Sequence, residues 1–324
     1  MTGASGHIGA NLVRALLARG RSVRVLVHAE SRALDGLDVE RVPGDVRDPE
    51  AVRRACAGVE VVQHLAAVIS IDGDLGGLVP SVNVGGAGTV ADAALAAGVR
   101  RMVHMCSVHA FAQDETDAVL DETCARAVGP GHPAYDRSKA AGERAVRDVV
   151  ARGLDAVLLH PTGVIGPCDF GPSRMGQVLL DLARRRMPAL VDGGYDFVDA
   201  RDVVDAALAA ADAARGRRGE SYLLAGGWSS VRGVAEAAAR ATGVAPPRLD
   251  APMWVARAGA PFVAAYHRVA GGMPLFTPES LRALRCGRNI SSAKARRDLG
   301  WNPRPLAETV ADTYAWFRAA GMLA

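Results

Sequence analysis

The chain has 324 residues, 49% of them hydrophobic, and a formal net charge of only +3 at pH 7. No block of lysine and arginine points to nucleic acid, no uncharged stretch of about 18 residues could span a bilayer, and the start does not read as a secretory signal. The five cysteines lie far apart without a C-x-x-C pair, which indicates neither a disulfide framework nor a zinc site. We expect a cytoplasmic protein that acts on a small molecule, with no nucleic-acid, membrane or metal partner.

Short β-branched or apolar runs alternate with helical patterns through the first half of the chain. Helical spacing covers residues 11–19, 49–57, 84–97 and 138–152, and strand-like runs cover 22–28, 39–43, 59–67, 100–107 and 155–161. Strands that are apolar on both faces and separated by helices predict a doubly wound parallel sheet that helices cover on both sides.

The rhythm changes after Pro161. Residues 163–176 are rich in glycine and proline and predict a loop, 195–211 bring back a strand and a helix, and 221–227 read as another strand. From residue 229 the chain reads as mainly helical. We expect a dinucleotide-binding domain at 1–165 to which 195–225 return, and a smaller substrate-binding lobe made of 166–194 and 226–324.

Three glycines at a three-residue spacing, Gly3, Gly6 and Gly9, run directly into the first helical pattern. A helix N-terminus carries unpaired N–H groups and a partial positive charge, so it binds phosphate well. Glycine permits the tight turn and the close approach of a pyrophosphate. Because the spacing differs from the usual G-x-G-x-x-G fingerprint, the glycines alone indicate either a dinucleotide site or an ordinary turn.

Three polar side chains are candidates for proton chemistry. Tyr135 and Lys139 are four residues apart, so they share one face of a helix. We expect the ammonium group to lower the pKa of the phenol from about 10 toward neutrality. Ser107 ends the run at 100–107, and ligands gather at the carboxyl ends of parallel strands. The alternatives are an exposed helix start for the pair and a turn cap for the serine.

Together these features resemble the extended form of the short-chain dehydrogenase/reductase superfamily. The segment TGASGHIG is similar to that family's T-G-x-x-G-x-x-G loop, GDVRD at 44–48 to its adenine-contacting segment, and HLAA at 64–67 to the turn beneath the adenosine ribose. HPTGVIGP at 160–167 is similar to the R-P-x-x-V-x-G-P loop beside the nicotinamide, with His160 where arginine is usual. The resemblance spans nearly the whole chain. It implies an α/β fold of the Rossmann type with a smaller, mainly helical C-terminal lobe.

The resemblance also implies roles for individual residues. Tyr135 gives or takes a proton at the substrate oxygen, Lys139 lowers the pKa of that tyrosine and binds the nicotinamide ribose, and Ser107 holds the substrate oxygen. Hydride then passes between the substrate carbon and the nicotinamide. The positions expected to bind the cofactor are Gly3, Ser5, Gly6, His7, Ile8, His28, Arg32, Asp45, Val46, Leu65, Ala66, Ala67, Asn83, Tyr135, Lys139, Pro161 and Val164.

The choice between NAD and NADP depends on the end of the strand-like run at 22–28. His28 stands where an acid would indicate NAD and an arginine would indicate NADP. Arg32 could reach a 2′-phosphate, whereas Glu30 argues for NAD. We favour NADP and keep NAD as the alternative.

The motifs leave more than one reaction open. Sugar-nucleotide epimerases usually show Y-G-x-S-K, but this chain has Asp136 in place of that glycine. The sequence is closer to the dihydroflavonol-reductase and 3β-hydroxysteroid-dehydrogenase-like branch. We therefore expect an oxidoreductase that interconverts a ketone or aldehyde and a secondary alcohol on a mid-sized, apolar or alicyclic substrate. A nucleotide-sugar epimerase or dehydratase is the alternative, with Arg174 and Arg184 to Arg186 available for a diphosphate. A non-catalytic NADP-sensing regulator is a third, although such relatives typically lose the tyrosine and lysine.

Bulky apolar side chains of the second half, together with Phe111, make the predicted lobe apolar. Most of them are expected to be ordinary core residues, and they favour an apolar substrate. They are Trp228, Met253, Trp254, Phe262, Tyr266, Met273 and Phe276. Two further expectations follow from the resemblance. The family's first strand, which precedes the glycine loop, is missing before Met1, so we expect a start site placed too late or a trimmed chain. The alanine-rich helices at 84–97 and 138–152 are expected to form a homodimer interface.

Overall fold

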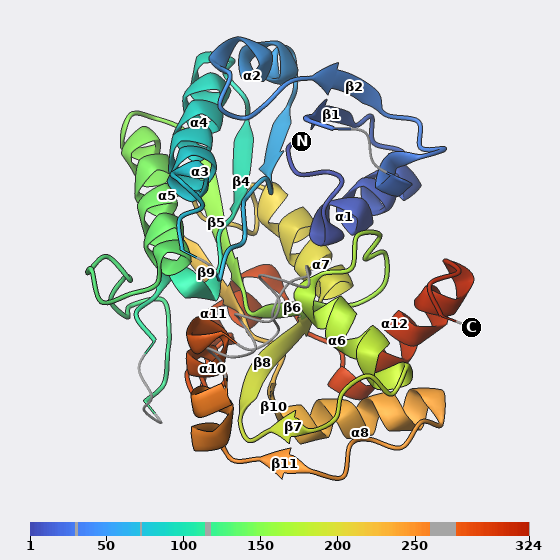
Figure 1. Cartoon of the computed structure of the whole chain (residues 1–324). Coiled ribbons are helices and arrows are strands. Elements are labelled where there is room, and N and C mark those ends of the chain that lie inside the picture. The colour runs from blue at the N-terminus through green and yellow to red at the C-terminus, as the bar shows by residue number, and fades with distance from the viewer. Residues whose placement is uncertain (30–31, 72, 114–117, 260–276, 324) are drawn as a thin grey trace.

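The computed structural model describes residues 1–29, 32–71, 73–113, 118–259 and 277–323. A parallel sheet lies at the centre of the fold (Figure 1), with strand order β3-β4-β5-β9. Its strands are β3 (Val61–His64), β4 (Arg101–Met105), β5 (Ala156–Pro161) and β9 (Ser221–Leu224). A second parallel pair is formed by β1 (Arg24–Val27) and β2 (Glu40–Pro43). The predicted parallel α/β sheet is confirmed.

The first two residues connect these two sheets. The Leu26 N–H donates to the Met1 carbonyl at 2.9 Å, and the Leu65 N–H donates to the Thr2 carbonyl at 3.2 Å. Thr2 also forms an isolated parallel bridge with His64 of β3. Met1 and Thr2 therefore lie between β1 and β3. The expectation of a lost first strand stays a prediction.

Helices cover both faces of the sheet, as the alternating pattern predicts. One core packs α2 (Pro49–Cys56), α4 (Ala87–Ala96) and α5 (Ala134–Ala151) against the sheet. The other packs α1 (His7–Ala18), α7 (Ala200–Ala211) and α11 (Ala293–Leu299). Neighbouring residues of β4 belong to different cores, because Met102 faces the first and Val103 the second. The helices α4 and α5 correspond to the expected dimer helices, and that interface stays a prediction.

The segment predicted as a loop after Pro161 contains regular structure, so that prediction is wrong. The strand β6 (Gly163–Ile165) pairs in parallel with β8 (Gly194–Asp199), and β8 pairs antiparallel with β10 (Trp228–Ser230). The helix α6 (Arg174–Ala183) begins where the Ser173 side chain accepts a hydrogen bond from the Gly176 N–H. Such a cap offsets the weak helix propensity of the glycine-containing first turn.

The second lobe packs around its own core, which is built from α6, α8 (Val231–Thr242) and α12 (Leu306–Ala319). Shorter elements complete the fold. They are β7 (Leu190–Val191), which pairs with β11 (Asp250–Ala251), α3 (Leu78–Pro80), the π-helical turn η2 (Ser81–Gly86), α10 (Pro278–Ala283), and the 3₁₀ turns η1 (Arg32–Leu34) and η3 (Val108–Ala110). Among the described residues, no helix combines the length and apolar character needed to cross a bilayer.

Candidate active site

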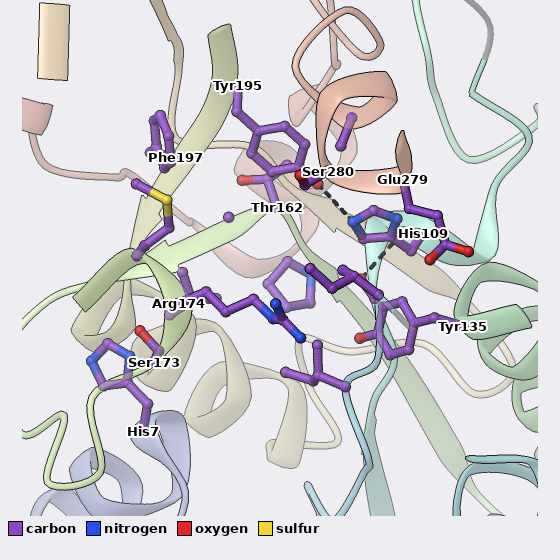
Figure 2. A pocket seen from close by; sticks show the side chains of 18 of the residues that line it. His7, His109, Tyr135, Thr162, Ser173, Arg174, Tyr195, Phe197, Glu279 and Ser280 are labelled. Carbon is purple, nitrogen blue, oxygen red and sulfur yellow. Dashed lines mark hydrogen bonds between the residues drawn. The ribbon is translucent and has the colours of Figure 1, made fainter. Parts of the chain in front are cut away.

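A cavity of about 530 Å³ lies between the glycine loop, the carboxyl ends of β4 and β5, and the second lobe. Figure 2 shows side chains from both parts of the chain converging on it. Ser107, Tyr135 and Lys139 all line this cavity, together with Gly3, Gly6 and Gly9. The sequence therefore predicted two groups of residues that the fold brings to one place.

The glycine loop forms a tight turn directly before α1. Gly3 has φ +68°, and a Cβ at this position would lie 2.6 Å from the Ala66 nitrogen. A Cβ on Gly9 would lie 2.1 Å from the Gly3 carbonyl oxygen, so the turn closes only with glycine at both positions. Gly6 precedes α1 without a side-chain cap, and a Cβ on it would lie 3.4 Å from the Gly3 carbonyl oxygen, in ordinary contact. The uncapped N–H groups at the start of α1 fit the pyrophosphate of a dinucleotide.

Ser107 and Tyr135 come from different elements and meet in the cavity. Ser107 directly follows β4 and caps η3, because its hydroxyl oxygen accepts the His109 N–H at 3.2 Å. The turn-cap interpretation of Ser107 is thus correct, and the same side chain also lines the cavity. Tyr135 lies in the first turn of α5, with its hydroxyl beside Ser107.

Lys139 follows one turn later and is buried. Its ammonium donates to the Met105 carbonyl at 3.4 Å, and burial lowers its pKa. Burial also raises the pKa of Tyr135 well above its usual value, and the neighbouring Ser107 hydroxyl offsets only part of this. The expected lowering of the Tyr135 pKa by Lys139 is therefore not found. A phenol taken out of water holds its proton more tightly, and this effect on the pKa of Tyr135 exceeds that of the Ser107 hydroxyl.

The proposed cofactor positions divide into two groups. Those in the cavity wall are Gly3, Gly6, His7, Ile8, Leu65, Ala67, Tyr135, Lys139, Pro161 and Val164. Ser5, Ala66, Asn83 and the residues expected to contact the adenosine half do not line it. Asn83 is buried, and its amide donates to the Val68 carbonyl and the Ser138 hydroxyl, each at 2.9 Å. Asn83 thus ties the loop after β3 to α5 behind the cavity.

The residues at the ends of β1 and β2 lie together on the surface. The exposed His28 has its Nε2 3.3 Å from an Asp45 carboxylate oxygen, and Arg47 binds the same oxygen at 2.7 Å. The Arg47 side chain holds the pKa of Asp45 low, at about 2. Val46 is buried against Gly86, while Arg32 is exposed in η1. Glu30 lies outside the described residues.

Comparison with known proteins agrees with this geometry. Residues 1–225 match the model of the NAD dependent epimerase/dehydratase family. The chain belongs to this family. It is 41% identical to Sterol demethylase protein B of Methylococcus capsulatus, with 100% of this chain and 99% of that protein covered. It is 31% identical to a putative dihydroflavonol 4-reductase of Synechocystis sp., with 99% and 94% covered. The crystal structure of gox2253 superposes with a TM-score of 0.86 at 30% identity, covering 100% of this chain and 98% of that one.

Membership of this epimerase/dehydratase family makes the chain an NAD-dependent oxidoreductase or epimerase of the extended short-chain type. The fold predicted from the sequence is the fold of the family's solved structures. One solved structure at 23% identity contains UDP-glucose and NAD, and at that distance it shows the fold alone.

The bulky apolar side chains singled out in the sequence do not line the cavity where the structure describes them. Phe111 is fully buried against His160, Trp228 and Trp254 are 38% and 73% exposed, and none of these lines the cavity. Met253 packs against the small core of Val191 and Leu281 and does not line the cavity. The expected Phe262, Tyr266, Met273 and Phe276 lie outside the described residues. The apolar wall comes instead from α6, the strand β8 and α8, with Met175, Val178, Leu182, Met187, Phe197, Val231 and Val234.

Among the described residues, three charged side chains line the cavity besides Asp136 and Lys139. Arg174 extends from the start of α6 into the cavity (Figure 2), and Glu279 and Arg282 line it from α10. Arg184 to Arg186 follow the end of α6, are exposed and do not line the cavity. Of the arginines considered for a diphosphate, only Arg174 is therefore in place.

Three further polar residues of the site were not predicted as site residues. His109 Nδ1 lies 2.9 Å from an Asp136 carboxylate oxygen, and His109 Nε2 lies 3.0 Å from the Tyr195 hydroxyl. All three residues line the cavity. The available signal in the sequence was Asp136, an acid where sugar epimerases have glycine, directly after the candidate catalytic tyrosine.

Proposed function

We propose that this protein interconverts a ketone and a secondary alcohol by hydride transfer with a nicotinamide dinucleotide. The observation that carries the proposal is the shared cavity, in which the glycine turn, Ser107, Tyr135 and Lys139 face one space. A dinucleotide whose phosphates bind at the start of α1 has its nicotinamide end directed along this cavity toward β4 and β5.

Each polar group has a distinct task in the proposed reaction. The bound nicotinamide supplies or accepts the hydride. Ser107 and Tyr135 hold the substrate oxygen through their adjacent hydroxyls. Because burial raises its pKa, Tyr135 is protonated at neutral pH, which is the state that gives a proton to the oxygen of a ketone during reduction. Lys139, buried one turn along α5, binds the nicotinamide ribose.

The cavity supports an apolar substrate of moderate size. Its walls in α6, β8 and α8 are aliphatic and aromatic, and such surface contributes about 25 cal/mol for each Å² of apolar area that a ligand buries. The name of the Methylococcus capsulatus relative refers to sterol demethylation, and a sterol is a fused-ring secondary alcohol. We infer an alicyclic carbinol or ketone as the substrate class.

A nucleotide-sugar epimerase or dehydratase is the second candidate. Arg174 favours it, because its side chain reaches the cavity and an arginine is a common ligand of a diphosphate. The acid at position 136 and the aliphatic walls favour the oxidoreductase. A non-catalytic NADP sensor would not need both Tyr135 and Lys139 in the cavity wall.

The test is a spectrophotometric assay of NADPH and NADH oxidation with cyclohexanone, trans-2-decalone and 5α-androstan-3-one, alongside UDP-glucose. We expect stoichiometric consumption of the reduced cofactor with at least one of the cyclic ketones. An epimerase returns its cofactor to the starting state, so conversion of UDP-glucose without net oxidation would replace this proposal with the second candidate.

We further propose NADP as the preferred cofactor. His28 is exposed beside Asp45, and Arg32 is exposed in η1, which follows β1; the adenosine ribose of a bound dinucleotide would lie at the end of β1. The guanidinium of Arg32 would pair with a 2′-phosphate. Arg32→Ala should therefore weaken NADPH binding by about tenfold and leave NADH binding within about twofold, measured by isothermal titration. Equal losses for both cofactors would show that Arg32 does not read the 2′-phosphate.

A further inference from the structure

Asp136, His109 and Tyr195 form a continuous hydrogen-bonded chain beside the candidate catalytic tyrosine. The Asp136 carboxylate can only accept, so His109 Nδ1–H donates to it at 2.9 Å. This leaves His109 Nε2 as the acceptor in the neutral ring, and the Tyr195 hydroxyl donates to it at 3.0 Å. A carboxylate, an imidazole and a hydroxyl in this order are an arrangement that moves a proton off a hydroxyl.

These three hydrogen-bonded residues border the space in which a substrate carbonyl would be held. The His109 ring meets the Tyr135 ring edge to face, with centroids 5.4 Å apart. The Tyr195 ring packs against β6, where a Cβ on Gly163 would come within 2.8 Å of its Cδ1. Figure 2 shows His109 and Tyr195 directed toward each other over the cavity, with Tyr135 next to His109. The position of Tyr195 is fixed both by the imidazole and by the close strand beneath it.

Neither His109 nor Tyr195 is needed for hydride transfer, which Ser107, Tyr135 and Lys139 already serve. The cavity therefore holds a second set of proton-transferring groups next to the first. The carbon adjacent to a carbonyl is the position where such a set can act, because hydrogen bonds to the carbonyl oxygen make the neighbouring C–H acidic.

We propose that Asp136, His109 and Tyr195 catalyse keto–enol proton transfer at the carbon beside the substrate carbonyl. The Tyr195 oxygen takes the proton from that carbon while its own proton passes to His109 Nε2, and the imidazolium is stabilised by Asp136. The C–H electron pair moves into the new C=C bond of the enolate, whose oxygen is held by Ser107 and Tyr135. Return of a proton along the same path restores the ketone, so no oxidant or reductant is consumed.

Burial raises the pKa of Tyr195 strongly, which agrees with a phenol that keeps its proton until His109 receives it. This inference rests on the proposed function, because it requires a ketone bound at Ser107 and Tyr135. The reaction it adds is the exchange of hydrogen on carbon, which hydride transfer alone does not produce at that position.

The test measures deuterium incorporation into trans-2-decalone in D₂O by NMR, with the wild-type enzyme saturated with NADP⁺ so that no ketone is reduced. Reduction of the same ketone with NADPH is measured in parallel. We expect incorporation at the carbons beside the carbonyl well above the enzyme-free rate. Tyr195→Phe and His109→Phe should each lower exchange by at least about tenfold more than they lower reduction, since a positioned acid–base group typically contributes 10²- to 10⁴-fold.

Matched variants separate chemistry from folding. Tyr222→Phe removes a phenolic hydroxyl from β9, outside the cavity wall, and should leave both rates unchanged. His109→Gln can offer an amide oxygen to Tyr195 and should restore the position of its ring but not the exchange. Reduction without exchange in the wild type, or parallel losses of both rates in the Tyr195 and His109 variants, would overturn the inference. Absence of both reactions would instead count against the proposed function on which it rests.

Discussion

His160 holds the backbone at Ser107, since its Nδ1 lies 3.1 Å from the Ser107 carbonyl oxygen. A carbonyl only accepts, so Nδ1 carries the proton and Nε2 accepts from the Ser221 hydroxyl at 3.0 Å. The ring is fully buried and packs edge to face against Phe111. The residue that replaces the arginine of the family motif thus supports the carboxyl end of β4, where the candidate catalytic serine lies.

The substitution His160→Leu should both destabilise the protein and slow the reaction. Two buried hydrogen bonds are lost, which lowers the free energy of unfolding by about 2 kcal/mol. Displacement of Ser107 should lower kcat/KM for ketone reduction by about tenfold. His160→Asn is the matched variant, because its amide can still donate to the Ser107 carbonyl. Urea unfolding measures the loss of stability, and steady-state kinetics measure the loss of kcat/KM. Equal losses in His160→Leu and His160→Asn would contradict a role of His160 through its hydrogen bond to the Ser107 carbonyl.

Buried neutral histidines should make the protein sensitive to mild acid. Burial lowers the pKa of His160 to about 4 and that of His64 to about 3, and it lowers the pKa of His104 as well. The unfolded chain binds these protons from about pH 6.5 downward, so it binds more protons than the folded state between that pH and about 4. Stability is therefore complete above pH 6.5 and falls as the pH decreases, by about 3 kcal/mol for His160 alone.

The free energy of unfolding measured from pH 7 to pH 4 tests this expectation. The wild type should lose stability steadily across that interval, and His160→Asn should show a slope smaller by about 1.4 kcal/mol per pH unit, since one proton fewer is taken up. A slope that is the same in both proteins would show that His160 is not the group that titrates.

Tyr135→Phe should remove turnover without removing the cofactor. Loss of the proton donor typically lowers the rate by 10²- to 10⁴-fold, and a phenylalanine fills the same space on α5. NADPH affinity, followed by quenching of protein fluorescence, should stay within about threefold, because no phosphate contact is altered. In Lys139→Met the affinity itself should fall, since this side chain is proposed to bind the ribose. Ketone reduction at the wild-type rate in Tyr135→Phe would exclude the proposed mechanism.

The parallel sheet was predictable because its signal is local. The apolar run that contains Met102 and Val103 shows by itself that both faces of the strand are covered. That Ser107 and Tyr135 lie in one site could be predicted only from the family resemblance and from the rule that ligands gather at strand ends. Both kinds of inference use residues close in sequence or a fixed topology.

The missed features depend on distant contacts. Asp136 and Tyr195 belong to different elements, and nothing near either residue in the sequence reveals that His109 joins them. The start of α6 was hidden by neighbouring glycine and proline, although Ser173 is a typical helix cap. Bulky apolar residues were expected mostly in the core by their type, which is correct for the fully buried Phe111. Trp254 is largely exposed, because residue type alone does not say which side chains the tertiary fold covers.

Two glycines of the same loop should respond in opposite ways to one added methyl group. A Cβ on Gly9 would lie 2.1 Å from the Gly3 carbonyl oxygen, which is backbone and cannot move without opening the turn. Gly9→Ala should therefore lower the free energy of unfolding by about 3 kcal/mol. A Cβ on Gly6 would lie 3.4 Å from the same oxygen, in ordinary contact, and its φ of −75° suits any residue.

Gly6→Ala should consequently fold with the stability of the wild type to within about 0.5 kcal/mol. Its methyl group would instead occupy the space beside the uncapped N–H groups of α1, where the pyrophosphate approaches the backbone. We expect NADPH and NADH affinity to fall by at least about tenfold together, measured by isothermal titration beside thermal unfolding. Full cofactor affinity in a stable Gly6→Ala protein would mean that the phosphates bind elsewhere than at the glycine turn.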